Sequence, residues 1–435
     1  MPETCDVAII GGGVIGCAIA HRLGSEGRDV VLIDAGDRLG LGASDAAMGG
    51  ILTQTEPACL GPLSTVIKRS RDIYQDWLDE LTSISGAAVH VLDGGDIQVA
   101  LDDAAMTRLE TDVLPQWKNS PFAVVRLTAA DAKELEPLLS DAVVGGFLLP
   151  EELALDPREL MVALGRALTL EGGAVRVRLG SRATGLESTP NGVVVELGDG
   201  SRISAGTVVV AAGHHSVHFL PELREHLFPI KGEAFDMRPP GATTYPLRHH
   251  VFTEIIEDGY EGYPYLVPRH DGRVAVGVTY EPRVGEAEVT DRARDEIMRG
   301  VAALMPAATN WPIEKRWAGL RPGSTDHMPI IGFVDVHERV LAATGHSGLG
   351  VTLAPVTAEM VSALIRRDVD EETRKRLDIC RPDRTFVAAT PAETTATPAE
   401  TAAARARTAA ARAETAATPA DRAATPVETP APTTP

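Results

Sequence analysis

Cysteine is scarce in this sequence. It occurs four times in 435 residues, as Cys5, Cys17, Cys59 and Cys380, and no two of these have the close spacing of a metal knuckle or a redox pair. We therefore expect no metal site, and ordinary reduced thiols of the kind typical of the cytosol. The sequence predicts a cytoplasmic protein.

Basic residues and long apolar runs are also few. The chain has 41 Lys and Arg against 61 Asp and Glu, and its net charge of −20 repels phosphate backbones, which argues against a nucleic-acid partner. The N-terminus lacks the basic, apolar and small-residue regions of a signal peptide, and glycines interrupt the apolar run at residues 7–20. Since no other stretch reaches the roughly 18 to 20 apolar residues needed to cross a bilayer, we expect no membrane span.

Hydrophobic residues are plentiful although aromatic ones are not. They make up 44% of the chain, which is more than one average domain needs. After about Asp383 the composition changes to Ala, Thr, Pro, Glu and Arg, with Thr-Pro-Ala-Glu-Thr as an imperfect repeat. Such a segment has too little apolar bulk to offset its ordering entropy. We expect two intertwined domains and a disordered tail over residues 384–435.

Periodicity and turn residues predict an α/β fold. An apolar strand, a helix and a second strand follow one another at the N-terminus, and later apolar runs are typical of further strands of the same parallel sheet. The turn sequence His270-Asp271-Gly272 predicts a hairpin. The expected strands are residues 6–10, 29–34, 90–100, 173–178, 192–197, 207–211, 262–268, 273–279 and 340–343; the expected helices are residues 14–24, 63–83, 104–117 and 354–366.

The first strand ends in a Gly-x-Gly-x-x-Gly motif that opens the first helix. Gly11 permits a tight turn, Gly13 lets the backbone approach a pyrophosphate, and Gly16 lets the helix pack on the strand. Asp34 follows the second strand, where a carboxylate accepts both hydroxyls of an adenosine ribose and repels the extra phosphate of NADP. The pattern predicts a dinucleotide site but does not distinguish FAD from NAD.

Two further segments favour FAD. Residues 40–50 are small and permit the backbone to pass closely over a pyrophosphate and a ring. Residues 208–213 form an apolar strand that ends in small residues, the last of them Gly213, as needed where a strand end abuts a nucleotide. Taken singly, each segment is also compatible with an ordinary loop.

The sequence resembles the FAD-dependent D-amino-acid oxidase superfamily, and within it glycine oxidase and its relatives. The most specific block is WAGLRPGSTD at residues 317–326, followed by PIIG at 329–332 and Gly-His at 345–346. Supporting blocks are PIKGE at residues 229–233 and YLVPR at 265–269, and the order of all blocks matches as far as about residue 366.

The resemblance implies a glutathione-reductase-type FAD-binding Rossmann domain interleaved with an α+β substrate domain that carries an antiparallel sheet. It implies FAD held without a covalent bond, since none of the four cysteines falls in the blocks that approach the ring. The expected cofactor domain comprises residues 1–85, 145–225 and 326–383. The expected substrate domain comprises residues 86–144 and 226–325.

The resemblance also implies specific cofactor contacts. Ala183 matches a position whose backbone meets the adenine, and residues 346–352 match a loop that wraps the flavin ring. The expected cofactor-binding residues, including those of the glycine motif, are Gly11, Gly13, Val14, Ile15, Gly16, Asp34, Ala35, Ala43, Ser44, Met48, Gly49, Gly50, Ala183, Gly213, His346, Ser347, Gly348, Leu349, Gly350, Val351 and Thr352.

Three residues are expected at the substrate. Arg321 matches the arginine that holds the substrate carboxylate, a task suited to its planar fork, although an ion pair bracing two domains is an alternative. Tyr265 matches a tyrosine at the edge of the active site, and packing is its alternative role. Tyr280 stands where glycine oxidase has a smaller apolar residue.

One departure from glycine oxidase bears on the substrate. Gly348 occupies the place of a substrate-adjacent arginine, which puts glycine itself in doubt and opens room for another substrate. We expect oxidative deamination of a glycine or D-amino acid by hydride transfer to flavin, with oxygen or another electron acceptor completing the cycle. A secondary amine such as sarcosine or proline, or an opine-like compound, is the runner-up.

The sequence also bears on two other functional classes. A non-catalytic flavoprotein subunit also fits the acidic surface and the repetitive tail, and a homo-oligomer is left open. A hydrolase that uses Ser347 as nucleophile is disfavoured, because Gly-x-Ser-x-Gly requires glycine where Leu349 stands.

Overall fold

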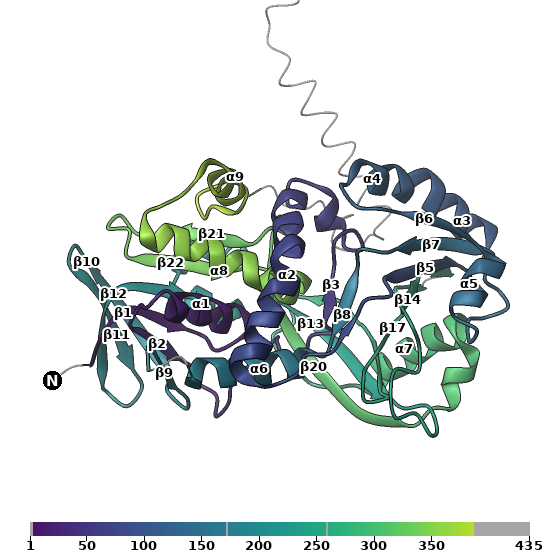
Figure 1. The fold of residues 1–435 in the computed structure, drawn as a ribbon, viewed down its shortest axis with the longest axis horizontal. Helices are drawn as coiled ribbons and strands as arrows, with labels where there is room; N and C mark the ends of the chain where they lie inside the picture. Colours follow the sequence, from purple (N-terminus) through teal and green to yellow (C-terminus); the bar gives the residue numbers. More distant parts are fainter. Residues whose placement is uncertain (1–2, 171–172, 258–259, 387–435) are drawn as a thin grey trace, which may run out of the picture.

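The computed structural model describes residues 3–170, 173–257 and 260–386. Figure 1 shows two large sheets arranged along the long axis of the molecule, with the helix α2 (Ser64–Ser85) between them. The expected tail lies outside the described residues from residue 387 onward. Each large sheet has its own buried apolar cluster, so the described chain forms two layered units.

The first sheet is mainly parallel and has eight strands. Its order is β10-β11-β12-β1-β2-β9, and β22 pairs with both β12 and β21. The pairs β12–β1, β1–β2, β2–β9 and β12–β22 are parallel, whereas β10–β11 and β11–β12 are antiparallel. The strands are β1 (Glu3–Ile10), β2 (Val30–Ile33), β9 (Val175–Arg178), β10 (Ala183–Thr189), β11 (Gly192–Leu197), β12 (Arg202–Val210), β21 (Ile330–Phe333) and β22 (Val340–Thr344).

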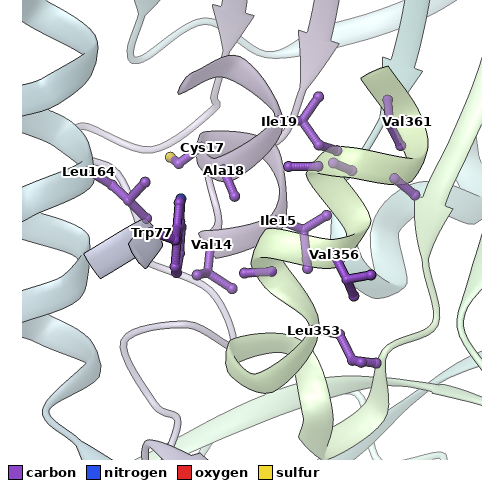
Figure 2. Packing of buried hydrophobic residues seen from close by; sticks show 14 of the residues in the cluster. Val14, Ile15, Cys17, Ala18, Ile19, Trp77, Leu164, Leu353, Val356 and Val361 are labelled. Carbon is purple, nitrogen blue, oxygen red and sulfur yellow. The ribbon is translucent and has the colours of Figure 1, made fainter. Parts of the chain in front are cut away.

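Helices α1 (Val14–Ser25), α6 (Pro157–Leu170) and α8 (Gly350–Arg366) join the same apolar cluster as this sheet. Figure 2 shows α1 packed against α8, with Ile15 close to Val356. The stretch Ser347–Arg366 is long and apolar enough, by length and composition, to cross a membrane, but 72% of its apolar window is buried in the protein. We interpret it as a core helix.

Helix α8 begins earlier than the sequence predicts. The expected start is residue 354, whereas the helix starts at Gly350 and contains Pro355 in its second turn. Proline has no N–H to donate to the carbonyl four residues earlier, which is that of Val351. The buried Tyr74 hydroxyl donates to that carbonyl at 3.0 Å, so an α2 side chain supplies the missing donor.

The second sheet has nine strands and is mainly antiparallel. Its order is β19-β13-β18-β17-β14-β5-β7-β6, and β20 pairs with β13 along its whole length. The predicted hairpin is confirmed as β17 and β18. The strands are β5 (Asp96–Ala100), β6 (Val125–Thr128), β7 (Gly145–Leu149), β13 (Leu227–Met237), β14 (His250–Thr253), β17 (Tyr265–Pro268), β18 (Val274–Gly277), β19 (Glu281–Pro282) and β20 (Ile313–Ser324).

Two predicted elements in this half are subdivided. The expected strand over residues 90–100 is two strands in different sheets, β4 (Val91–Leu92) and β5, because the chain turns at Gly95 with a φ of +85°. The expected helix over residues 104–117 is helical but contains one π turn, which is a common local widening of an α-helix. Its parts are α3 (Asp103–Arg108), the π-helical η2 (Leu109–Val113) and α4 (Leu114–Asn119).

The remaining elements connect or cover the two sheets. They are β3 (Gly50–Ile51) and β8 (Leu153–Leu155), which form a three-stranded sheet with β4; β15 (Ile255–Glu257) and β16 (Tyr260–Gly262); α5 (Ala129–Leu135), α7 (Asp291–Leu304) and α9 (Glu371–Cys380); and the 3-10 turns η1 (Pro57–Leu60), η3 (Gly213–His218), η4 (Pro221–Leu223), η5 (Pro306–Asn310) and η6 (Ser347–Leu349).

The strands of the two large sheets alternate along the chain. The first sheet takes its strands from three separate stretches of sequence, and the second sheet takes its strands from the stretches between them. Strand β7 pairs with β5 and β6 of the second sheet. We therefore propose that the cofactor segment expected from residue 145 begins after Leu149.

Candidate functional site

One cavity collects most of the residues singled out in the sequence. Its volume is about 1220 Å³, compared with roughly 300–1,000 Å³ for the usual pocket of a single small ligand. It therefore has room for a dinucleotide and a small substrate together. Its lining includes Gly11, Gly13, Val14, Ile15, Asp34, Ala35, Ala43, Ser44, Met48, Gly49, Gly50, Ala183, Gly213, His346, Ser347, Gly348, Leu349, Gly350 and Val351, together with Tyr265, Tyr280 and Arg321.

Two of the expected cofactor residues do not line the cavity. Gly16 lies behind the glycine turn, where a Cβ would overlap the carbonyl oxygen of Gly11. Thr352 is fully buried in the first turn of α8, and its hydroxyl accepts the N–H of Leu52 at 2.9 Å. Both residues therefore support the backbone that lines the cavity without lining it themselves. Thr352 lies in α8 and not in the loop expected over residues 346–352.

The glycine turn places bare backbone at the ends of parallel strands. Gly11 has a φ of +112°, and a Cβ there would overlap the carbonyl of Ala211 on the neighbouring strand end. The turn is held by a hydrogen bond from the N–H of Gly11 to the carbonyl of Ile33 at 2.8 Å. Helix α1 starts directly after it; its N-cap residue Gly13 has no side chain, its first turn has no acidic residue, and its first residues line the cavity. Its positive end is thus directed to the cavity.

Asp34 is fixed by backbone donors at the tip of β2. Its two carboxylate oxygens accept the N–H groups of Gly12 at 2.5 Å and Gly36 at 2.7 Å. Ser44 accepts the N–H of Val14 at 2.8 Å, which ties the loop over residues 43–50 to the first turn of α1. The acid and the helix start are therefore preorganised on the same side of the cavity.

The second sheet holds this loop from the other side. Buried Arg269 donates to the carbonyl oxygens of Met48 at 2.6 Å and Leu155 at 2.5 Å. The indole N–H of Trp317 donates to the carbonyl of Ala46 at 3.1 Å. These contacts fix the backbone of the loop where Met48 lines the cavity.

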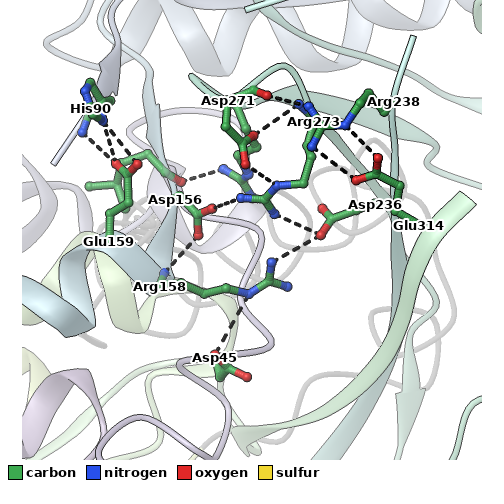
Figure 3. A network of polar contacts seen from close by, with 12 residues as sticks. Asp45, His90, Asp156, Arg158, Glu159, Asp236, Arg238, Asp271, Arg273 and Glu314 are labelled. Atoms are coloured by element: carbon green, nitrogen blue, oxygen red, sulfur yellow. Dashed lines mark hydrogen bonds and ion pairs between the residues drawn. The ribbon is translucent and has the colours of Figure 1, made fainter. Parts of the chain in front are cut away.

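An ion-pair network extends this support across the boundary between the two sheets (Figure 3). Arg273 contacts Asp156 at 2.7 Å and Asp236 at 2.9 Å, and Arg158 contacts Asp236 at 3.1 Å. Arg158 also lies 3.9 Å from Asp45 in the loop. Because these groups are partly or fully buried and come from four separate segments, the network fixes the two halves of the cavity relative to one another.

The Gly-His block lies where α8 meets the cavity. Ser347 has a φ of 49°, an uncommon conformation for a residue with a side chain. The ring nitrogen Nε2 of His346 lies 3.0 Å from the hydroxyl of Thr357, and burial lowers the pKa of His346 to about 3. His346 is therefore neutral and contributes shape and hydrogen bonding rather than charge.

Arg321 reaches the cavity from β20. Its backbone pairs with that of Ile230 on β13. Its guanidinium lies over Gly232, and a Cβ at Gly232 would overlap the guanidinium. Its nitrogen Nη1 is buried and has no hydrogen-bond partner within the described chain. An unpaired buried donor on a cation is costly, so this nitrogen is suited to an anionic group of a ligand.

Tyr265, on β17, lies beside Arg321 of β20. Burial raises the pKa of its phenol to about 12, with Glu56 adding to the shift and the charge and hydrogen bonding of Arg321 opposing it. The phenol is therefore a neutral hydrogen-bonding group. Tyr280 also lines the cavity but is 47% exposed, which places it at the rim.

A buried acidic group anchors the segment between Thr53 and Glu56. Glu152 accepts the backbone N–H groups of Thr53 at 2.7 Å, Gln54 at 2.6 Å and Thr55 at 3.1 Å. Burial and the nearby charge of Asp96 raise the pKa of Glu152 to about 8, whereas the hydrogen bonds from Thr53, Gln54 and Thr55 lower it. The result is a fixed backbone that brings Thr55 and Glu56 to the cavity wall.

Several lining residues were not foreseen from the sequence. The histidines of η3 carried a local signal, since they follow the small-residue end of β12 directly. Arg182 and Gly232 lie beside or within segments that the sequence analysis singled out, whereas most of the others lie in segments that carried no such signal. They include Thr55, Glu56, Arg182, His214, His215, His218, His250, Phe252, Tyr263, Gly232, Glu296 and His327.

The donor set fits a flavin dinucleotide. Gly11 and Gly13 line the cavity without side chains, so bare backbone is available to a pyrophosphate, and Asp34 is in place for a ribose. No cysteine lines the cavity, so no thiol is placed to attach a ring covalently. Within the described ranges, no three His, Cys, Asp or Glu side chains are grouped so that they could hold a metal ion.

Comparisons with known proteins agree with this geometry. The family model described as FAD dependent oxidoreductase (DAO) matches residues 6–364. A glycine oxidase of Bacillus licheniformis is 27% identical over 367 residues, covering 84% of this chain and 94% of that protein. The bifunctional protein ThiO/ThiG of Synechocystis sp. is 28% identical over 393 residues, covering 90% of this chain and 56% of that protein.

A solved structure shows the same architecture. The crystal structure of glycine oxidase from Geobacillus kaustophilus has a TM-score of 0.77 at 26% identity, and the match covers 85% of this chain and 96% of that chain. The expected resemblance and α/β fold class are thereby confirmed. The chain belongs to the family of FAD-dependent oxidoreductases, and its cofactor is FAD, held without a covalent bond.

Proposed function

We propose that this enzyme oxidises the carbon–nitrogen bond of a small α-amino acid, with the hydride of the α-carbon passing to FAD. Arg321 is the observation that carries the proposal. Its buried Nη1, without a partner in the described chain, faces Gly232 in the cavity that also holds the glycine turn. A guanidinium grips both oxygens of a carboxylate, and that grip orients the rest of a small substrate.

Bound FAD supplies a two-electron acceptor at its ring. Arg321 and the neutral Tyr265 phenol hold the substrate carboxylate, which fixes the α-carbon toward the ring. The amine must be neutral, because its lone pair forms the new carbon–nitrogen double bond while the α-hydrogen leaves with its electron pair. Water then adds to the imino acid, and ammonia and a keto acid leave. Oxygen or another acceptor would be the terminal oxidant of the reaction.

The relatives support an amino acid as substrate, since two of those described above are named glycine oxidase. A second candidate is a secondary amine that carries a carboxylate, such as sarcosine or proline. Gly348 favours it, because the cavity wall there has no side chain at the place where glycine oxidase carries an arginine. Both candidates use Arg321 in the same way.

The test is anaerobic reduction of the purified yellow protein. Glycine, D-alanine, sarcosine and proline are each compared with the amine that lacks the carboxylate: methylamine, ethylamine, dimethylamine and pyrrolidine. We expect bleaching of the flavin spectrum by one or more of the acids and by none of the amines. Equal bleaching by both members of a pair would contradict the role of Arg321. Bound flavin that no amine or acid reduces would indicate a non-catalytic flavoprotein. Reoxidation by air, compared with a quinone, then identifies the acceptor.

A further inference from the structure

A histidine and an aspartate form a buried pair in the wall of the cavity. His250, on β14, lines the cavity and is 5% exposed, and Asp96, on β5, is fully buried. The two residues are partners in the register of the parallel strands β14 and β5, so their side chains lie side by side on one face of the sheet. Nδ1 of His250 lies 2.7 Å from Oδ2 of Asp96, a close contact that lacks the alignment of a regular hydrogen bond.

The pair lies next to the carboxylate site formed by Arg321 and Tyr265. The ring of His250 packs edge to face against the ring of Tyr265, with their centres 5.3 Å apart. In an α-amino acid the amino group and the carboxylate are attached to the same carbon. A substrate whose carboxylate is held by Arg321 therefore has its amino group in the part of the cavity that His250 lines.

One ring nitrogen of His250 is left without a partner. A carboxylate as close as that of Asp96 favours a proton on Nδ1, which leaves the lone pair on Nε2. Nε2 is buried, and no group in the described part of the chain donates a hydrogen bond to it. A buried acceptor without a donor is costly. A substrate ammonium group is the kind of donor that this atom lacks.

Asp96 carries the charge that favours a protonated imidazole. Its charge is one cause of the raised pKa of Glu152, so Asp96 is the ionised member of this carboxyl pair. The hydroxyl of Thr55 donates to Oδ2 of Asp96 at 3.4 Å. An ionised carboxylate beside an imidazole stabilises the imidazolium. The charged and titratable groups on this side of the cavity are Asp96 of β5, Glu152 before β8, Glu56 before η1, Tyr265 of β17 and Arg321 of β20.

We propose that His250 is a further catalytic residue, the base that takes a proton from the substrate ammonium group, and that Asp96 is its positioning residue. The inference rests on the proposed function, since it assumes an amino acid whose carboxylate is held by Arg321. An N–H bond of the ammonium group breaks, its electron pair stays on the substrate nitrogen, and the proton forms a bond to Nε2 of His250. The α-hydrogen then leaves with its electron pair to FAD. The imidazolium releases its proton to water when the product has left.

The first test is the pH dependence of anaerobic flavin reduction in the FAD-loaded full chain, with the amino acid that reduces the unaltered protein fastest. Between pH 7.5 and pH 8.5 a free amino acid is mainly an ammonium ion, and its neutral fraction rises about tenfold per pH unit. With a base in the site the proton stays within the complex, so kcat/KM of the unaltered protein should change less than about twofold over this interval.

His250→Gln keeps a donor for Asp96 but takes up no proton. Its kcat/KM should be about a hundredfold lower at pH 7.5 and should rise about tenfold by pH 8.5, because only the neutral amine then reacts. His270→Gln, on the exposed turn of the β17–β18 hairpin and outside the cavity lining, is the matched control and should keep the profile of the unaltered protein.

Asp96→Asn tests the positioning residue. The acid limb of the kcat/KM profile should move to lower pH, because the imidazolium loses the charge that stabilises it. A purely structural role of Asp96 would lower kcat/KM by the same factor at every pH. An acid limb that does not move would overturn the role of Asp96.

The second test measures binding without turnover. α-Aminoisobutyrate has no α-hydrogen and cannot reduce the flavin, and isobutyrate also lacks the amino group. Perturbation of the flavin spectrum gives the Kd of each compound. His250→Leu has no acceptor, so it should bind α-aminoisobutyrate about tenfold more weakly and isobutyrate as before. Equal weakening of both complexes would overturn the contact between His250 and the amino group.

The outcomes separate this inference from the proposed function. A tenfold rise of kcat/KM from pH 7.5 to pH 8.5 in the unaltered protein, or an unchanged profile in His250→Gln, would overturn the role of His250 and leave the proposed function intact. Reduction by none of the amino acids would overturn the proposed function and this inference with it. If the variants do not fold, the profile of the unaltered protein decides the question.

Discussion

The two ends of the cavity are built in different ways. The nucleotide end depends mainly on local backbone: Gly11 and Gly13 are bare, and the Asp34 carboxylate is fixed by the N–H groups of Gly12 and Gly36. The substrate end consists of side chains, such as Arg321 and Tyr265, that two strands of another sheet bring together. Substitutions in a site built from backbone disturb the fold itself, whereas substitutions in a site built from side chains can change its charge without a change of fold.

The largest effect is expected at the nucleotide end, from Gly16→Ala. A Cβ at Gly16 would overlap the carbonyl oxygen of Gly11, and that oxygen belongs to backbone which cannot rotate away. Overpacking of this kind costs about 1–3 kcal/mol or more, and here it also displaces the turn that meets the cofactor. We expect a protein that is purified without flavin or not recovered folded, as measured by the flavin absorbance per chain.

Gly61→Ala is the control for this variant. Gly61 has a φ of −115° and nothing within 4 Å of an added Cβ, and it does not line the cavity. It should retain a full complement of flavin. Normal flavin content in Gly16→Ala would show that the turn adapts more readily than the packing indicates.

The next largest effect is expected at the substrate end, from Arg321→Ala. Loss of a bidentate charged contact and of the orientation that it provides should lower kcat/KM about a thousandfold. The flavin should remain bound, since the glycine turn and Asp34 are untouched. Stopped-flow reduction and the flavin spectrum measure the two properties separately. Loss of flavin together with activity would show that the two ends are not independent.

Sequence patterns predicted the nucleotide end better than the substrate end, because the first is built from neighbouring residues and the second from residues far apart in the sequence. The glycines, α1 and Asp34 lie within a short stretch, so local geometry and spacing contain the information. Glu56 lies at the cavity because Glu152, 97 residues from Thr55 in the sequence, anchors the segment. No local pattern specifies such a contact.

The predicted elements that proved wrong in detail depend on tertiary contacts. The strand expected over residues 90–100 is divided between two sheets, and local alternation does not reveal which partners pair. In the first turn of α8, the carbonyl that Pro355 leaves without its helical donor accepts from the Tyr74 hydroxyl of another helix. By contrast, Arg321 was expected only because the surrounding block resembles a known family. Its pairing opposite Ile230 follows from the register of two long strands.

A smaller effect is expected from Tyr265→Phe. The phenol is one hydrogen-bonding group beside the charged Arg321, and its loss should lower kcat/KM about tenfold. Since the pKa of Tyr265 is raised to about 12, the unaltered enzyme should show no ionisation of this group between pH 6 and pH 10. A pH profile that loses a basic limb below pH 10 in Tyr265→Phe would contradict this assignment.

The smallest effect is expected from acid, through His214 on η3. Burial, together with the charges of His215 and His218, lowers the pKa of His214 from 6.5 to about 4. Above pH 6.5 the ring is neutral in both the folded and the unfolded chain. As the pH falls below 6.5, the unfolded chain takes up the proton first, so the stability of the folded chain decreases until about pH 4.

His214→Asn tests this assignment, because asparagine keeps a polar side chain but does not titrate in this range. The urea midpoint of the flavin-loaded protein should fall less between pH 7.5 and pH 5 in the variant than in the unaltered chain. His337→Asn, at an exposed position outside the cavity lining, is the control for replacing an imidazole by an amide. If the urea midpoint of His214→Asn falls as far as that of the unaltered chain, groups other than His214 cause the loss of stability in acid.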